Sequence, residues 1–414
     1  MIRIERTEYL PILIIFCSFS AIIFYGRIFT MNTIAMGLLN TSIIACVLWN
    51  KKLYFAPDNW KDYRIVQFYF VWMIIGVVRG IFVAENYWEG KQLFEGSVAL
   101  SLPIFVYVFS IPEILKNTLR LWIKIALPMF ILFILVSDRE SYHCYLGPVL
   151  LLSCFLPIIP KKWIYIFLSL LFLMMVVDLG ARSQVIKSAV ALLISAAYLL
   201  SKFFSPRLLH IVHWICYIVP IILLYLGITG IFNPFQALSD GADGKYTQES
   251  KIAGIEGEED IAADTRTFIY VEVIESAVRH QYIWHGRTPA RGNDSWTFGA
   301  FSAEELQTGK YERHANELCH PNVFTWLGLI GTVLYSLIYL KSSYLALYKS
   351  NNIWIKLLGV FIAFRWAFGW IEDDNLFNIM NIAIWMMIAM GFSEQFRKMS
   401  DLEFKNWVLK IFEK

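Results

Sequence analysis

The sequence predicts an all-α polytopic membrane protein with about 12 transmembrane helices and one large periplasmic loop containing short helices. Composition is the first observation behind this prediction. Of the 414 residues, 57% are hydrophobic and only 17% are charged, which lies outside the usage of soluble globular domains. The second observation is the length of the apolar runs, because a hydrocarbon core about 30 Å thick needs about 20 apolar residues per helix. The third is a single long polar stretch, residues 231–320, that separates two groups of such runs.

These runs divide the chain into three parts. Residues 1–230 carry helices 1–9, residues 231–320 form the large periplasmic loop, and residues 321–414 carry helices 10–12 and a cytoplasmic tail. No small-residue cleavage site follows the first run, so we expect it to be a retained helix and not a signal peptide. The predicted spans are residues 10–26, 28–49, 65–84, 93–111, 119–137, 144–160, 163–179, 183–201, 208–229, 321–341, 353–371 and 376–392.

The placement of lysine and arginine predicts the orientation. With the N-terminus inside, the connections predicted to be cytoplasmic contain most of the cations, for example Lys51, Lys52, Lys161 and Lys162, whereas the short outer connections contain few. The charged C-terminal tail falls on the same side as the N-terminus. The sequence therefore predicts cytoplasmic termini and a periplasmic large loop in a bacterial inner membrane.

The large loop begins with an acidic, glycine-rich segment, residues 239–264, which we expect to be a solvated loop. Its Asp-Gly-Ala-Asp-Gly start lacks the alternating ligands and the closing glutamate of a calcium loop. A metal-dependent transferase would need acidic ligands in the outer loops. Glu85 and Glu89 form no compact pair, and we interpret the run Glu372 to Asp374 as a solvated loop or a partner of Arg365. The sequence thus predicts no metal site.

The second half of the loop reads as two short helices around a turn. Asp264 is a candidate N-cap for the first helix, and Glu275 can pair with Arg279 one turn later. Residues 284–293 are rich in glycine and proline and predict a turn. Ser302 and Glu305 have the spacing of a capping box, which predicts a second helix towards Leu318.

Several cations fall near the outer ends of predicted spans, where a charge is costly unless it pairs, reaches the interface or faces a polar cavity. Pairing is open to two of them, because Glu372 lies seven residues from Arg365 and Asp178 is close to Arg182. All of these cations are predicted to lie on the outer side of the membrane, which also favours an anionic ligand at that surface. Guanidinium groups bind phosphate oxygens through paired hydrogen bonds. The cations are Arg79, Arg182, Lys187 and Arg365.

Four short motifs occur in a fixed order along the chain. They are Asp178-Leu179-Gly180-Ala181-Arg182 at an outer helix end, the segment beginning Asp264-Thr265-Arg266, the turn His285-Gly286-Arg287, and a histidine and asparagine before the apolar run Gly328 to Gly331. This order resembles the O-antigen ligase and O-antigen polymerase superfamily. The resemblance covers the whole topology, although each motif is short.

The resemblance implies that Arg182 and Arg266 bind the lipid diphosphate and that His320 activates the acceptor hydroxyl as general base. Here Pro321 separates His320 from Asn322, where the family pattern has histidine directly before asparagine, so His314 is the alternative base. We expect further substrate contacts from Arg79, Arg287, Arg291, Arg365, His314 and Asn322.

The expected reaction transfers a lipid-diphosphate-linked glycan to a sugar hydroxyl. A neutral imidazole suits proton abstraction, and arginines stabilise the leaving diphosphate, so no cofactor is expected and attack at the anomeric carbon inverts its configuration. The resemblance implies as partners an undecaprenyl-diphosphate-linked oligosaccharide, an acceptor glycolipid, a chain-length regulator and a flippase, with no nucleic acid.

Alternatives differ in the acceptor or in the class of protein. The acidic segment 239–264 favours a polymerase over a ligase, because a ligase must accept an anionic lipid A core. A transporter or flippase predicts two similar halves with interrupted helices near mid-membrane, and the sequence has no such repeat.

Overall fold

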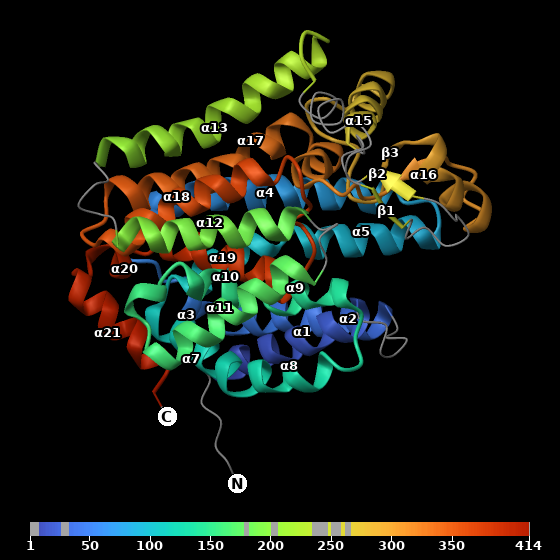
Figure 1. Cartoon of the computed structure of the whole chain (residues 1–414). Helices are drawn as coiled ribbons and strands as arrows, with labels where there is room; N and C mark the ends of the chain where they lie inside the picture. Colours follow the sequence, from blue (N-terminus) through green and yellow to red (C-terminus); the bar gives the residue numbers. More distant parts are fainter. Residues whose placement is uncertain are drawn as a thin grey trace.

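The computed structural model describes residues 8–25, 33–177, 182–199, 206–233, 247–249, 258–260 and 266–413. It is 78% helix with almost no strand, so the predicted all-α class is confirmed. In Figure 1 the long helices lie side by side along one direction, and the short elements that follow α13 gather at one end of them. The molecule therefore has two regions, the bundle of long helices and the group of short elements at one end of it.

Four helical segments of the described chain are long and apolar enough to cross a membrane. They are α4 (Trp60–Val83), the segment Tyr87–Phe109 that contains α5 (Tyr87–Leu100) and α6 (Phe105–Phe109), most of α13 (Pro206–Ile228), and α17 (Cys319–Tyr348). Three shorter apolar helices accompany them, α1 (Tyr9–Tyr25), α2 (Thr33–Trp49) and α19 (Ile379–Phe392).

The other helices complete the bundle and its ends. They are α3 (Lys51–Tyr54), α7 (Pro112–Leu121), α8 (Leu127–Phe133), α9 (Tyr142–Tyr145), α10 (Gly147–Ser153), α11 (Lys161–Val176), α12 (Arg182–Leu199), α18 (Ile353–Phe368), α20 (Glu394–Lys398) and α21 (Asp401–Ile411).

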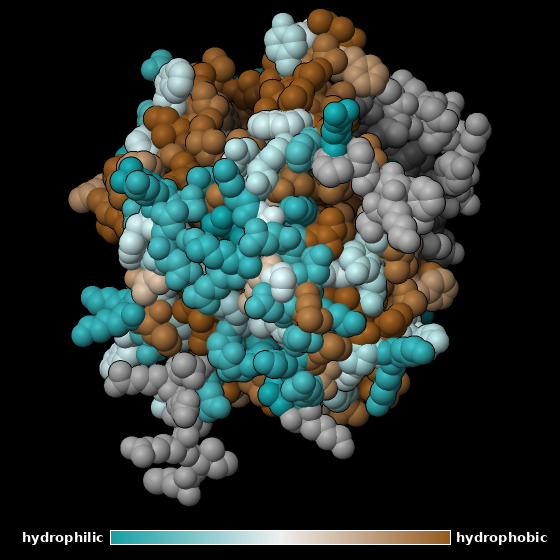
Figure 2. All heavy atoms as spheres, turned by 90° about the vertical axis from the view of Figure 1, so that its left-hand side faces the viewer, coloured by the Kyte–Doolittle hydropathy of each residue, from teal (hydrophilic) through white to brown (hydrophobic). Residues whose placement is uncertain are grey.

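Helix α19 forms the centre of the bundle. All of its residues are buried, and it packs against α6, α10, α17 and α18. A helix that is apolar all round belongs in such a core. Figure 2 shows the end of the bundle that lies on the left of Figure 1, with hydrophilic residues gathered over its middle and hydrophobic residues along its flanks. An apolar flank with a polar end is the surface expected of a membrane bundle.

The predicted span 144–160 is wrong as one continuous helix. The chain forms α9, then α10, then a 3-10 turn at Leu156–Ile158. Pro148 and Pro157 each stand in the first turn of their element. Proline has no N–H to donate and its ring clashes with the preceding turn, so each proline begins a new element instead of continuing one.

Residues 266–318 form a small unit that we call the loop subdomain. It contains α15 (Thr267–Arg279), β3 (Asn293–Asp294), α16 (Trp296–Ala300), a π turn (Phe301–Glu305) and β4 (Glu312–Arg313), with β3 and β4 antiparallel. Before it, β1 (Thr247–Glu249) pairs with β2 (Glu258–Asp260). In Figure 1 the loop subdomain covers the right-hand end of the bundle.

Three local predictions for the loop subdomain are corrected. The N-cap of α15 is Arg266, and Asp264 lies outside the described residues. Arg279 pairs with Asp294 at 2.8 Å instead of with Glu275. The helix expected from Ser302 towards Leu318 ends at Glu305, because Gln307 and Gly309 adopt positive φ of 53° and 67°. A left-handed backbone ends a helix.

Helix α17 is broken at Gly328, where φ is 69° and ψ is −170°. The turn at residues 283–288 supplies hydrogen bonds to the break: the N–H of Arg287 donates to the carbonyl of Thr325 at 2.7 Å, and that of Leu329 to the carbonyl of Ile283 at 2.7 Å. Gly286 crosses Gly328 so closely that a Cβ on either glycine would overlap the backbone of the other strand of chain. The loop subdomain is therefore docked onto the broken helix.

We predict that Gly328→Ala lowers the free energy of unfolding by at least about 1–3 kcal/mol, because this backbone conformation is essentially restricted to glycine and the Cβ overlaps Gly286. Thermal unfolding in detergent measures the loss. Gly90→Ala is the matched control, since no atom lies within 4 Å of its added Cβ. Equal stability of the two variants would contradict the close crossing.

Candidate functional site

The connection between α18 and α19, residues 369–378, carries a buried group of charges. Lys187 of α12 donates to both carboxylate oxygens of Glu372, at 2.7 and 2.6 Å. Arg365 of α18 donates to Asp374 at 2.5 Å and lies 3.8 Å from Glu372. The Lys187 side chain is 0% exposed and that of Arg365 2%, so neither charge is solvated by water. The carboxylates of this connection replace that solvation.

The same connection also binds neighbouring elements through its backbone. The carbonyl of Ile371 accepts a hydrogen bond from Nε of Arg266 at 3.0 Å, and the carbonyl of Trp370 accepts one from the hydroxyl of Tyr270 at 2.5 Å. The N–H of Cys319, at the start of α17, donates to the carbonyls of Gly369 and Glu372, each at 3.0 Å. Helices α12, α15, α17 and α18 therefore meet at one short segment.

His320 lies against this connection and is buried. Its Nε2 is 2.9 Å from the carbonyl of Trp366, which can only accept, so Nε2 carries the proton and Nδ1 carries the lone pair. Nδ1 is buried without a hydrogen-bond partner among the described residues. The ring of Trp370 lies 4.4 Å from the imidazole, centroid to centroid. The lone pair of His320 is thus oriented but enclosed.

Asn322 and His314 have structural partners in the loop subdomain. Asn322 accepts from the N–H of Asn316 at 2.6 Å and donates to its carbonyl at 2.8 Å, which fastens the end of the loop subdomain to α17. Nε2 of His314 lies 3.5 Å from the hydroxyl of Ser302. Burial lowers the pKa of His314 below its usual value despite the nearby charge of Glu312, so its imidazole is neutral at pH 7.

Arg287 and Arg291 are occupied by carboxylates. Arg291 donates from Nε and Nη2 to Glu312, whose Oε1 also lies 3.0 Å from Arg287. Arg287 further donates to Asp294 at 3.2 Å. These ion pairs join β3 to β4. The sequence predicted that the two arginines contact substrate.

Arg79 and Arg182 lie at the same end of the bundle. Arg79 donates to the carbonyls of His285 at 2.9 Å and Gly286 at 3.3 Å, so it stabilises the turn that crosses Gly328. Arg182 is exposed at the first position of α12, and two residues later Gln184 lies 3.4 Å from Glu372. The Asp178 partner predicted for Arg182 lies outside the described residues.

The structure therefore brings Arg266, His320 and Arg365 around residues 366–374, with Arg182 at the same helix end. It does not bring Arg287 and Arg291 to this segment through any contact of the described residues. Pairing of Arg365 with Glu372 is as predicted, but Asp374 is the closer partner.

An apolar pocket of about 480 Å³ adjoins this segment. Residues of α13, α15 and the end of α18 line it, including Leu224, Tyr270, Ile274, Trp370 and Ile371. Trp370 lines this pocket and its ring also packs against His320, while Ile371 lines the pocket and accepts the hydrogen bond of Arg266. A charged segment and an apolar pocket are thus contiguous.

Sequence reasoning missed the positioning contacts of Tyr270 and Trp370 and the role of Lys310. Lys310 binds Glu85 at 2.7 Å and Glu89 at 2.5 Å, and so fastens the loop subdomain to α5. The cluster Glu372 to Asp374 directly after an arginine-containing helix was the available signal for the buried charges. Among the described residues, no group of three histidine, cysteine or acidic side chains could hold a metal ion.

Comparison with protein-family models, with curated proteins and with solved structures finds no match for this chain.

We predict that Lys187→Met costs about 3–5 kcal/mol of stability, because it leaves the Glu372 carboxylate buried without its nearest cation. Adding Glu372→Gln recovers a large part of that loss. Chemical unfolding in detergent measures both variants. Lys398→Met is the control: Lys398 is exposed and its partner Glu394 is partly exposed, and ion pairs at the surface contribute about 0–1 kcal/mol. Equal losses for Lys187→Met and Lys398→Met would contradict a buried charge cluster.

The loop subdomain should lose stability in acid. Burial raises the pKa of Glu312, but the hydrogen bond from Arg291 and the charges of Arg287 and Arg291 outweigh it and lower that pKa below 4.5. The stabilisation is therefore complete above about pH 4.5 and disappears as pH falls through the lower folded-state pKa. Hydrogen exchange of peptides from residues 266–318, after correction for intrinsic rates, should accelerate below about pH 4.5, beyond the gradual loss of stability that the lowered pKa of His314 causes as pH falls below 6.5. Glu312→Gln should remove most of this dependence, and an unchanged acid transition in that variant would refute the assignment.

Proposed function

We propose that this chain is a membrane glycosyltransferase that transfers a lipid-diphosphate-linked glycan to the hydroxyl of an acceptor sugar. One observation carries the proposal: Arg266, Lys187 and Arg365 surround the α18–α19 connection directly beside an apolar pocket of about 480 Å³. A lipid diphosphate has the same two parts, a strongly anionic group and an apolar chain. Arginine and lysine at a site with little water stabilise the charge that develops on a leaving diphosphate.

The buried carboxylates give the cations a partner before substrate arrives. Glu372 and Asp374 neutralise Lys187 and Arg365, which removes the cost of two buried unpaired cations. A diphosphate that enters beside Ile371 competes with these carboxylates for the same cations. A diphosphate esterified at both ends carries one negative charge on each phosphate, and its oxygens accept the same paired, charge-assisted hydrogen bonds from a guanidinium group as a carboxylate does.

The orientation of His320 supports its role as general base. Donation from Nε2 to the carbonyl of Trp366 fixes the tautomer that leaves Nδ1 able to accept a proton from the acceptor hydroxyl. Arg182 and Arg266 are proposed to bind the diphosphate, Arg365 to support them, and His314 to be the alternative base. Displacement of the diphosphate at the anomeric carbon inverts its configuration and needs no metal or nucleotide.

The location and the acceptor complete the proposal. We place the reaction at the periplasmic face of a bacterial inner membrane, in a chain of about 12 spans with both termini cytoplasmic. The preferred reaction is polymerisation of O-antigen or capsular repeat units carried on undecaprenyl diphosphate, with a flippase and a chain-length regulator as partners. Ligation to a lipid A core is the alternative with the same donor.

A glycolipid flippase is the second candidate function, and the break of α17 at Gly328 favours it. Transporters commonly place interrupted helices at their binding sites. Here, however, the freed backbone groups bond to residues 283–288 of the loop subdomain and so do not line a cavity. The polymerase proposal therefore remains the better supported of the two.

The test uses purified chain in liposomes, with an undecaprenyl-diphosphate-linked oligosaccharide supplied outside only. We predict a ladder of glycan products. His320→Ala should lower the initial rate about 10²–10⁴-fold and Arg266→Ala about 10²–10³-fold, because they remove the base and a diphosphate cation. Addition of EDTA should leave the rate unchanged.

Arg279→Ala is the matched control for Arg266→Ala. It removes a cation from the same helix, α15, at a side chain that is 60% exposed and paired with Asp294. It should retain the parental rate. A normal ladder from His320→Ala would reject the proposed base, and transbilayer movement of the lipid without any new glycosidic bond would establish the flippase instead.

A further inference from the structure

A second groove lies at the opposite end of α4 from the candidate site. Residues of α4, α13 and α17 line a groove of about 430 Å³, and its lining includes Lys61, Arg64, Phe68, Trp214, Leu337 and Tyr344. Lys61 and Arg79 stand roughly 27 Å apart along α4 at 1.5 Å per residue. The groove is therefore separate from the contacts that Arg79 makes with the loop subdomain.

The two helices α4 and α17 each line the groove with both charged and apolar side chains. Lys61, Arg64, Ile65 and Phe68 follow the spacing i, i+3, i+4, i+7 and share one face of α4. Leu337, Leu340, Lys341 and Tyr344 repeat that spacing on α17. In α4 the two cations come first, whereas in α17 the one cation, Lys341, comes after Leu337 and Leu340. The two stripes pair their polar halves only when the helices run antiparallel, and one groove lined by both has this arrangement.

The charged half has a surplus of cations. Asp62 is the one carboxylate lining the groove, and it already binds Lys341 at 2.9 Å and Arg397 at 3.3 Å. Lys61 and Arg64 are exposed and have no carboxylate partner among the residues that the structure describes. An anionic group is the ligand that would complete them.

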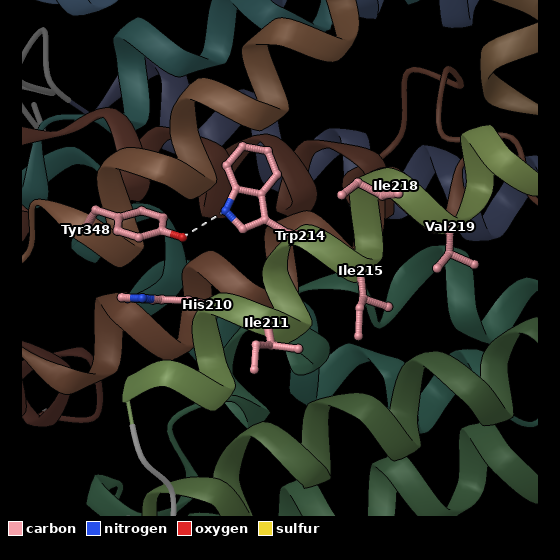
Figure 3. Close-up of a pocket in the computed structure, with 7 residues that line it drawn as sticks. All are labelled: His210, Ile211, Trp214, Ile215, Ile218, Val219 and Tyr348. Atoms are coloured by element: carbon pink, nitrogen blue, oxygen red, sulfur yellow. Dashed lines mark hydrogen bonds between the residues drawn. The ribbon is translucent and has the colours of Figure 1, made fainter.

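Aromatic side chains next to the groove indicate that this end of the bundle lies at a membrane–water interface. Nε1 of Trp214 donates to the hydroxyl of Tyr348 at 3.1 Å, which Figure 3 shows from the adjoining face of α13. Tyr348 stacks on Tyr344 with centroids 4.7 Å apart. Tryptophan and tyrosine concentrate where acyl chains meet headgroups. The cations thus lie at headgroup level, and Phe68 and Leu337, both exposed, at acyl-chain level.

We propose that this groove binds one anionic phospholipid, with its phosphate between Lys61 and Arg64 and an acyl chain along Phe68 and Leu337. Charge complementarity favours this occupant over a zwitterionic lipid, because two exposed cations without a carboxylate partner among the described residues attract a net negative headgroup. The apolar half selects it over a free anion, which would leave Phe68 and Leu337 uncovered. The proposal is independent of the glycosyltransferase activity.

Native mass spectrometry of the full chain in detergent tests the proposal, with phosphatidylglycerol and phosphatidylethanolamine titrated separately. We expect one phosphatidylglycerol to bind in preference to phosphatidylethanolamine. Lys61→Gln and Arg64→Gln should each weaken phosphatidylglycerol binding about fivefold, and phosphatidylethanolamine binding should stay unchanged. The double variant Lys161→Gln/Lys162→Gln is the matched control: it removes two cations at the start of α11, outside the groove, and should bind as the parent does.

Three results would overturn the proposal. If the control double variant weakened phosphatidylglycerol binding equally, the binding would depend on the general surface charge and not on this groove. Displacement of phosphatidylglycerol by millimolar inorganic phosphate would assign the cations to a free anion. Undiminished phosphatidylglycerol binding by Phe68→Asn would show that no acyl chain lies along Phe68. Because Lys61 and Arg64 are exposed and make no ion pair among the described residues, unchanged melting temperatures of their variants should accompany the binding loss.

Discussion

The need to neutralise two buried cations determines how one end of this molecule is built. Lys187 and Arg365 belong to different helices, α12 and α18, and both are inaccessible to water. Removing a charge from water costs several kcal/mol unless a counter-charge replaces the solvent. The acidic run Glu372 to Asp374 supplies it, which holds the α18–α19 connection inside the protein. The backbone of that connection is then available to Arg266 and Cys319. The position of α15 and the start of α17 therefore follows from a charge balance.

A second constraint is steric and acts on the other half of the loop subdomain. Gly286 and Gly328 cross at a separation that leaves no room for a side chain, and each adopts a positive φ of about 70°. The crossing satisfies backbone groups that a broken helix would otherwise leave without partners inside an apolar bundle. Arg79 adds two hydrogen bonds to the same turn. The charge cluster and the glycine crossing therefore hold the loop subdomain at two separate places on α17 and α18.

The apolar runs predicted α12, α13 and α18 to within three residues at either end, because a long apolar run itself indicates a helix. The span 321–341 was expected to be continuous, but α17 is broken at Gly328. The span 144–160 failed since prolines begin new turns there, and the helix from Ser302 failed since its later residues adopt left-handed backbone. At the site, the sequence predicted that Arg365 pairs with Glu372 on one helix face; the pair does form, but α18 ends at Phe368 and Glu372 approaches from the connection that follows. Arg291 could not be assigned, because its partner Glu312 lies 21 residues away and approaches only through the β3–β4 pairing. Contacts set by tertiary pairing leave no periodic signal.

The enclosure of His320 constrains the proposed transfer. A general base must lie within about 3 Å of the proton that it accepts, yet Nδ1 of His320 is buried and the ring of Trp370 lies 4.4 Å from the imidazole. Trp370 also forms a wall of the apolar pocket, so a lipid that fills the pocket contacts the same side chain that encloses the base. The hydroxyl of Tyr270 holds the carbonyl of Trp370, not its ring. The transfer proposed above therefore requires the side chains around Nδ1 to move, and the ring of Trp370, which borders both the pocket and the imidazole, can move without breaking the backbone contacts of Arg266 and Tyr270.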